Sequence, residues 1–458
     1  MRLSRGHHLA YCTNIHPAET WAETLAALEE YTLAVRARVC PGRPFAIGLR
    51  LSDRASRELT EPSALLHFRR WLERHDCYVF TLNGFPFGRF HGGRVKERVY
   101  LPDWTSPERL EYTNRLFDLL AQLLPEGVAG SVSTVPGSFK EFITSPGQLD
   151  AIRGNFHACV KHISETSARA GRELCLGLEP EPLCLLETTR ETVDFLDRLR
   201  AEHPGDGRLE EFLGVNYDTC HLAVEFEEPA EALALLQKHR VKVCKIHLSN
   251  ALKLRIADCG LRIADCGLKA FADDTYLHQV VLRSAAGQLT RYRDLDALLN
   301  PQSAIRNPQS ANVDSARRDA CHGGRDARAP QSAIRNSQTW TVPGGTPATA
   351  GGTPALHNPQ SAIRNPQLEI RNPQWSEARV HFHVPLHTPP AEGFDTTRDH
   401  LLGVLDALQA GPKLCSHLEM ETYTWEVLPP ELKSRSVADQ LAAEYEWVLR
   451  ELRRRGLA

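Results

Sequence analysis

The sequence predicts an α/β protein built as a (β/α)8 TIM barrel. Short apolar runs alternate with segments that carry apolar residues at helical spacing along most of the chain. In residues 213–250, two such runs end in groups that can bind a metal, Asp218 with His221 and then His247, and a helical segment lies between them. Barrels and open α/β sheets both keep their chemistry at the carboxyl ends of parallel strands, so this strand–helix–strand unit fits either architecture, and the number of such units decides for the barrel.

The other elements follow the same alternation in chain order. Apolar runs that stop at turn residues predict strands at 9–15, 45–51, 78–82, 128–135, 174–178, 378–387 and 414–422. Amphipathic spacing predicts helices at 19–31, 56–75, 107–124, 147–170, 188–200, 397–408 and 437–455. Together with the unit at 213–250, eight strand–helix pairs can be counted, and we expect the barrel to close.

Composition limits the class of protein. The net charge of -3 results from 54 basic and 57 acidic residues without a long block of one sign, which favours neither nucleic acid nor an acidic membrane as a partner. No apolar run approaches the roughly 20 residues of a membrane helix, and the first residues do not form a signal peptide. The 12 cysteines stand singly, and Cys159, Cys175 and Cys244 fall in apolar patterns that suit reduced thiols. A soluble, cytoplasmic protein is expected.

Two blocks of repeats interrupt the pattern. The heptapeptide R-I-A-D-C-G-L fills 255–261 and again 262–268, and Q-S-A-I-R-N occurs at Gln302, Gln331 and Gln360. One codon set for the heptapeptide has a reverse complement that encodes Q-S-A-I-R-N-P, so we infer that repetitive DNA was inserted in frame twice. The segment 300–374 has too little apolar surface to order itself and is predicted to be a disordered loop between late strands of a single domain spanning 1–458.

Polar groups at successive strand ends predict a metal site. They are Glu179, then Asp218 and His221, then His247, and finally Glu421 or Glu419. Carboxylates with an imidazole suit a divalent ion such as Mn, Mg, Co or Zn. Such an ion can bind adjacent oxygens of a polyol or hydroxy-ketone, and carboxylates on opposite sides can move a proton at the neighbouring carbon. Aldose–ketose isomerisation and epimerisation need that chemistry.

Each of these groups also has a structural interpretation. Glu179 could cap a helix, and His247 could be a hydrogen-bonded core residue. His381 and His383, on one face of the predicted strand 378–387, are as compatible with a structural pair as with a site. The loop 83–93 and His16 could contact a substrate or only pack. The order of ligands on four separate strands favours the metal site.

Several motifs resemble known proteins. They are Y-C-T-N-I-H-P-A-E-T-W (11–21), N-G-F-P-F-G-R-F-H-G (83–92), V-K-E-R-V-Y-L-P-D-W (95–104), L-G-L-E-P-E-P (176–182), N-Y-D-T-C-H-L-A-V (216–224), V-H-F-H-V-P-L-H (380–387) and L-E-M-E-T-Y-T-W-E-V-L-P (418–429). The order E-P, D-x-x-H, H, E resembles the xylose isomerase-like TIM barrels, and the motifs together resemble the EboE family of metabolite-traffic proteins. The superfamily often has H-x-x-D where this chain has His247 to Asn250, so one usual acidic group is missing.

The resemblance implies roles for particular residues. It implies metal ligands at Glu179, Asp218, His247 and Glu421, with Glu179 and Glu421 also as the acid/base pair. His221 would lie close to substrate. His16, Asn83 and His383 are the further substrate-binding candidates.

Three functions remain open from the sequence. The first is a metal-dependent isomerase or epimerase of a sugar- or cyclitol-like metabolite, and the second is a non-catalytic metabolite-binding protein on the same barrel. The third, an endonuclease IV-like phosphodiesterase, is disfavoured by the near-neutral charge and by the small number of spare ligands. The resemblance leaves a homo-oligomer and other proteins of the same metabolite-traffic pathway open as partners.

Overall fold

A computed structural model describes residues 1–256, 268–299, 375–391, 394–411, 414–433 and 435–458. The predicted loop 300–374 lies outside the described residues, and so does most of the predicted duplication at 255–268. All residues predicted as metal ligands or substrate contacts lie within the described ranges.

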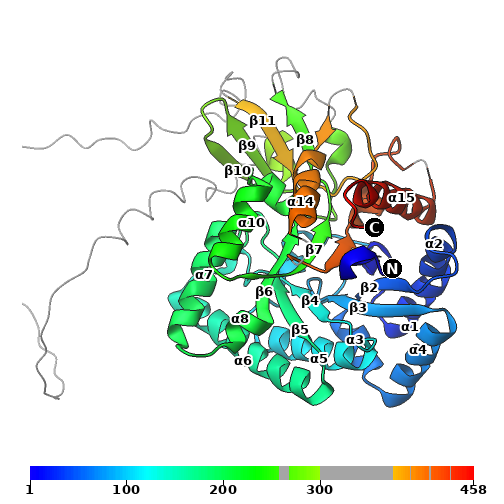
Figure 1. Cartoon of the computed structure of the whole chain (residues 1–458). Coiled ribbons are helices and arrows are strands. Elements are labelled where there is room, and N and C mark those ends of the chain that lie inside the picture. The colour runs from blue at the N-terminus through cyan, green and yellow to red at the C-terminus, as the bar shows by residue number, and fades with distance from the viewer. Residues whose placement is uncertain (257–267, 300–374, 392–393, 412–413, 434) are drawn as a thin grey trace, which may run out of the picture.

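Eight parallel strands form the central sheet, in the order β1-β13-β7-β6-β5-β4-β3-β2 (Figure 1). Their bounds are His8–Tyr11 (β1), Phe45–Arg50 (β2), Cys77–Asn83 (β3), Gly130–Thr134 (β4), Leu174–Leu178 (β5), Leu213–Asp218 (β6), Lys242–Leu248 (β7) and His417–Met420 (β13). A parallel bridge between Cys12 and Gly48 joins the end of β1 to β2 and closes the sheet. The predicted eight-stranded barrel is therefore confirmed.

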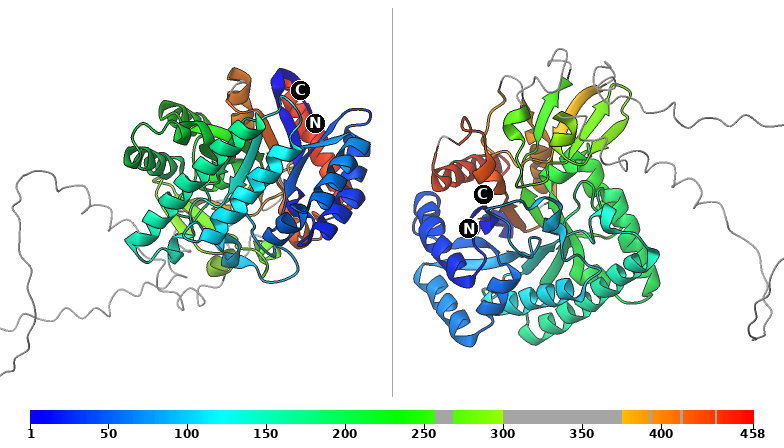
Figure 2. Two further views of the ribbon diagram at one scale, coloured as in Figure 1. Left: turned by 90° about the horizontal axis from the view of Figure 1, so that it is seen from below. Right: turned by 180° about the vertical axis from the view of Figure 1, so that it is seen from behind.

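Helices surround the barrel, as the views in Figures 1 and 2 agree. The longer ones are α1 (Trp21–Ala27), α2 (Leu33–Val39), α3 (Asp53–Leu59), α4 (Pro62–Arg74), α5 (Pro107–Leu123), α6 (Pro146–Ala170), α7 (Thr189–Glu202), α10 (Pro229–Lys238), α14 (Arg398–Ala410) and α15 (Val437–Arg454). Three short ones are α8 (Arg208–Phe212), α9 (Thr219–Val224) and α11 (Leu295–Leu299). No helix in the described part of the chain is both long and apolar enough to cross a membrane.

The predicted helix at 56–75 is wrong in one respect, since it is two helices, α3 and α4. The break falls at Thr60 and Glu61, and Pro62 is the first residue of α4. Proline disfavours helical backbone in the residue before it, and Glu61 accordingly has an extended ψ of 125°.

A second, smaller sheet lies beside the barrel and was not predicted. Its order is β10-β9-β11-β8-β12, and all its pairings are antiparallel. The strands are β8 (Leu252–Arg255), β9 (Val280–Ser284), β10 (Leu289–Tyr292), β11 (Trp375–Val380) and β12 (Asp395–Thr396). Val281 of β9 packs on Cys220 and Val224 of α9, which fixes this sheet against the barrel.

The predicted strand at 378–387 needs correction in both length and place. Only its first residues are a strand, β11, and this strand pairs with β8 and β9 of the small sheet instead of joining the barrel. His381 and His383 lie beyond the end of β11. Alternation of apolar residues shows which face of a strand is buried, but it does not name the partner strand.

The prediction of reduced thiols at Cys175 and Cys244 is also wrong, because the structure joins them in a disulfide between β5 and β7. Gly214 of β6 has no side chain there, and a Cβ atom on it would lie 3.0 Å from the sulfur of Cys244. That space lets the two side chains meet. Cys159 is free and buried, as predicted.

The carboxyl group of Glu444 in α15 predicts a pH dependence of stability. The side chain is fully buried, with Thr422 Oγ1 2.8 Å and Gln440 Nε2 3.3 Å from its oxygens, and burial raises its pKa to about 7. Because this pKa is higher in the folded state, its stabilising effect is complete below the ordinary value of 4.5 and is lost as the pH rises through about 7.

We expect Glu444→Gln to remove this loss. Between pH 5 and pH 8, the free energy of unfolding should fall on the order of 2 kcal/mol more in the wild type than in the variant. Urea unfolding at both pH values measures the difference. Other buried carboxyl groups contribute equally to both proteins, so parallel pH profiles would contradict the prediction.

Candidate metal centre

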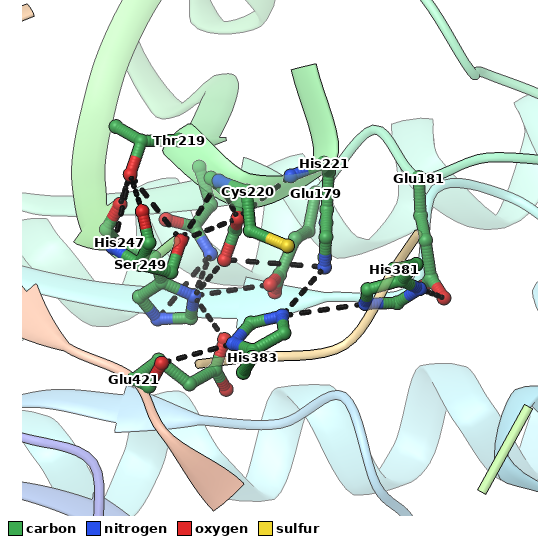
Figure 3. A network of polar contacts seen from close by, with 12 residues as sticks. Glu179, Glu181, Thr219, Cys220, His221, His247, Ser249, His381, His383 and Glu421 are labelled. Atoms are coloured by element: carbon green, nitrogen blue, oxygen red, sulfur yellow. Dashed lines mark hydrogen bonds and ion pairs between the residues drawn. The ribbon is translucent and has the colours of Figure 1, made fainter. Parts of the chain in front are cut away.

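Four of the predicted ligands meet at the carboxyl ends of four neighbouring strands. Glu179 follows β5, Asp218 ends β6, His247 lies in β7 and Glu421 follows β13. One potential ligand atom from each lies within 4.8 Å of the others, and all four side chains are buried. Figure 3 labels three of them, Glu179, His247 and Glu421. Sequence positions that are far apart therefore form one compact group, as the sequence predicts.

The Nδ1 atom of His247 lies at the centre of three carboxylates. It is 3.0 Å from Glu179 Oε1, 3.4 Å from Asp218 Oδ2 and 2.9 Å from Glu421 Oε2. Burial would lower the pKa of His247, but the charges of Glu421 and Glu179 hold it well above its ordinary value. Three buried carboxylates need a compensating positive charge, and a protonated imidazole supplies only one.

The residues present fit a divalent ion. Glu179 Oε2 and Asp218 Oδ2 are buried and have no hydrogen-bond partner among the described residues. Buried carboxylate oxygens without partners are costly unless a cation binds them. Three carboxylates with one imidazole form a donor set for Mn, Mg, Co or Zn.

The backbone of α9 orients Asp218. Its Oδ1 accepts hydrogen bonds from the backbone N–H groups of Cys220 at 2.7 Å and His221 at 3.0 Å, and from Ser249 Oγ at 2.7 Å. Asp218 is thus the N-cap of α9. Only Oδ2 is left to face the other ligands.

The two carboxylates of β13 and its end have different surroundings. Glu421 Oε1 accepts hydrogen bonds from Asn14 at 2.7 Å and Asn83 at 3.1 Å, which leaves Oε2 near His247. Glu419 instead lies 2.6 Å from Lys245 Nζ and 2.9 Å from the other ring nitrogen of His247, Nε2. Burial would raise the pKa of Glu419, but Lys245 and His247 lower it to about 2. Glu421 therefore belongs with Glu179, Asp218 and His247 to one four-ligand group. Glu419 orients His247 through its other ring nitrogen.

The predicted substrate contacts lie in different places. His221 lines a cavity that is also lined by Glu179 and Glu421. The Nδ1 atom of His383 lies 2.9 Å from the backbone oxygen of Glu421. Asn83 contacts Glu421 and thereby positions that carboxylate. His16 does not reach the cavity.

His16 instead packs away from the site. Its ring stacks on Tyr31 with a centroid distance of 4.5 Å, and its Nε2 lies 3.0 Å from the hydroxyl of Tyr11. Asn14, two residues earlier, lines the cavity, and its amide contacts Glu421. The prediction from this motif is therefore correct about the strand end, but the residue that lines the cavity is Asn14 and not His16.

Aromatic and polar side chains line the cavity together. Phe85 and Phe90 come from the predicted loop 83–93, Tyr423 follows Glu421, and Tyr276 precedes β9 of the small sheet. The loop after β3 therefore lines a pocket, as the sequence indicates. Tyr276 could not be predicted, because the small sheet was not.

Glu181 adds a titratable group to the lining of the cavity. Burial raises its pKa to about 7, although His221 and a hydrogen bond from Tyr100 lower it. Tyr100 Oη and Gln279 Nε2 donate to Glu181 Oε1 at 2.6 and 3.2 Å. The E-P-E-P motif places Glu179 and Glu181 on one face, and both side chains line the cavity.

More ligands are present than the sequence indicates. Within the described residues, two further groups are close enough to hold a metal: Asp218 with His221 and His383, and Cys220 with His381 and His383. The prediction of few spare ligands is therefore wrong. The prediction fails because the small sheet brings the segment after β11, which carries His381 and His383, back to the barrel.

Comparisons with known proteins add little to this geometry. No protein-family model matches the chain, and no curated protein matches it. Several solved structures are similar at low identity. IOLI protein with a binding zinc atom is 15% identical over 51% of this chain and 70% of its own, with a TM-score of 0.33. A xylose isomerase domain protein from Planctomyces limnophilus is 16% identical over 45% and 64%, with a TM-score of 0.32. D-psicose 3-epimerase with D-tagatose, from Clostridium cellulolyticum H10, is 12% identical over 59% and 83%, with a TM-score of 0.34.

Proposed function

We propose that the chain is a divalent-metal-dependent isomerase or epimerase that acts on a sugar- or cyclitol-like metabolite. The observation that supports this most is the placement of Glu179 and Glu421. They stand at the ends of β5 and β13, the outer two of four neighbouring strands, and both line the same cavity. A substrate in that cavity would have a carboxylate on either side.

The residues of the site would have different roles in this reaction. Glu179, Asp218, His247 and Glu421 would hold the ion, which supplies polarisation of a carbonyl and of a neighbouring hydroxyl when bound. Glu179 and Glu421 would remove a proton from the carbon next to the carbonyl and return one. Glu181, whose pKa burial raises to about 7, can hold or release a proton at a substrate oxygen near neutral pH.

The aromatic walls suit a ring with both polar and apolar faces. Phe85, Phe90 and Tyr423 can cover the C–H faces of a sugar or cyclitol and exclude water from the reacting carbon. The resemblance to EboE proteins extends the proposal to the traffic of a specialised metabolite.

Hydrogen exchange at carbon tests the proposal directly. In D2O, the metal-loaded protein should introduce deuterium next to the carbonyl of at least one member of a panel of ketoses, aldoses and keto-cyclitols, as followed by NMR. Glu179→Gln should lower that rate by about 100-fold or more, because the amide cannot accept the proton. Glu173→Gln is the matched control, since Glu173 is exposed just before the opposite end of the same strand and should leave the rate unchanged.

Other results would favour the binding-protein alternative. One panel member could raise the melting temperature of the protein without showing any exchange, and Glu179→Gln could only weaken its binding. That result would show that the chain is a metabolite-binding protein and not an enzyme. Plasma mass spectrometry supplies the second measurement. An equal metal content in the wild type and in Asp218→Ala combined with His247→Ala would rule out the metal centre itself.

A further inference from the structure

Three histidine rings face one another beside the four-ligand group. His221 comes from α9, whereas His381 and His383 come from the segment after β11 (Figure 3). The Nε2 atom of His383 is 3.3 Å from Nε2 of His381 and 3.4 Å from Nε2 of His221. All three side chains are buried.

The other ring nitrogens show where the protons are. The Nδ1 atom of His221 lies 3.1 Å from the backbone oxygen of Pro180, and that of His383 lies 2.9 Å from the backbone oxygen of Glu421. A carbonyl oxygen can only accept, so Nδ1 carries the hydrogen in both rings. Their Nε2 atoms are then lone-pair acceptors when the rings are neutral.

The same holds for His381. Its Nδ1 lies 2.7 Å from the side-chain oxygen of Gln279. The amide nitrogen of Gln279 points at three oxygens, those of Tyr100, Glu181 and Pro182, so the amide orientation is fixed and its oxygen is left for His381. His381 therefore donates through Nδ1 as well.

The lone pair of His383 Nε2 faces those of His381 and His221, and facing lone pairs repel each other unless a cation lies between them. A proton forms a hydrogen bond along one nitrogen–nitrogen line at a time, whereas a metal ion accepts more than one lone pair at once. Anchoring each ring by its second nitrogen is the usual arrangement of metal-binding histidines.

We propose that Asp218, His221 and His383, whose ligand atoms lie within 4.8 Å of one another, bind a second divalent ion, of the zinc class, next to the four-ligand group. Imidazole nitrogen ligands favour Zn over Mg or Ca. Asp218 provides the link between the two sites, because its Oδ2, which has no hydrogen-bond partner among the described residues, lies 3.9 Å from His221 Nε2 and 3.4 Å from His247 Nδ1. One carboxylate oxygen can therefore serve both ions. This second site does not depend on the proposed reaction.

Zinc stoichiometry tests the second site in the full-length protein. The protein is stripped with a chelator, dialysed against zinc, and analysed by plasma mass spectrometry. We expect two zinc ions per chain in the wild type and one in the variant that combines His221→Ala with His383→Ala. His400→Ala is the matched control, because His400 is also buried but belongs to neither ligand group, and it should keep two.

A second measurement on the wild type covers the case in which the double variant does not fold. After loading with Co2+, proton NMR detects exchangeable ring N–H signals shifted by the paramagnetic ion. Two filled sites predict three such signals, from the Nδ1–H groups of His221 and His383 and from the Nε2–H of His247, which faces Glu419. One filled four-ligand site predicts one signal. A single zinc ion with one signal, or two zinc ions retained by the double variant, would overturn the proposal. Neither measurement depends on turnover, so a protein without isomerase activity can still show both metal sites.

Discussion

Replacing Lys245 by methionine is expected to destabilise the folded protein by about 3–5 kcal/mol, because it removes the nearer of the two cationic groups that contact a buried carboxylate. The Nζ atom of Lys245 lies 2.6 Å from Glu419 Oε2 and 3.0 Å from Ser133 Oγ inside the barrel. The side chains of Lys245 and Glu419 are both fully buried. Burial would lower the pKa of Lys245, but Glu419 raises it, so the pair is charged at neutral pH.

Urea unfolding at pH 7 in the presence of a chelator measures this loss without a contribution from metal. Lys242→Met is the matched control, since Lys242 is exposed on the same strand, and it should change the free energy of unfolding by no more than about 0.5 kcal/mol. Adding Glu419→Gln to Lys245→Met removes both charges and should restore much of the loss. A change below about 1 kcal/mol in Lys245→Met alone would contradict the buried ion pair.

Gly48→Ala is expected to affect stability and metal binding together. A Cβ atom at this position in β2 would lie 1.8 Å from Glu419 Oε1 and 2.7 Å from the backbone oxygen of Tyr11. Glu419 cannot move aside freely, because Lys245 and His247 both contact it. We expect a loss of about 3 kcal/mol from overpacking. We also expect about tenfold weaker zinc binding, because His247 loses the group that orients it.

Chemical unfolding and zinc titration by calorimetry measure the two effects of Gly48→Ala. Gly154→Ala is the control, because a Cβ there meets nothing within 4 Å and the residue lies inside α6. That substitution should be neutral or stabilise the protein by about 0.5–1 kcal/mol. If Gly48→Ala has the same stability and zinc affinity as the wild type, Glu419 is not packed closely against residue 48, and the prediction is contradicted.

The barrel and its ligand group were predictable because both depend on local patterns. The strand predicted at 174–178 is β5 with the same bounds, and its end places Glu179 in the ligand group. Parallel strands bring their carboxyl ends to one side, so ligands on separate strands meet without any knowledge of side-chain contacts.

Other features were not predictable because they depend on contacts between distant segments. Glu419 and Glu421 share a face, and only their depth in the barrel separates the ion pair with Lys245 from the ligand position. His16 and Asn14 follow the same strand, and the ring of Tyr31 takes His16 out of the cavity. The small sheet has short strands separated by repeats, so its partners were not evident.

The strand order of the small sheet also constrains the order in which the protein can be assembled. β11 lies between β9 and β8, yet residues 300–374 separate it from the preceding helix α11. During synthesis, β8 and β9 leave the ribosome without the strand that joins them, and His381, His383 and Glu421 follow later still. Both ligand groups therefore become complete only while the last quarter of the chain is being made.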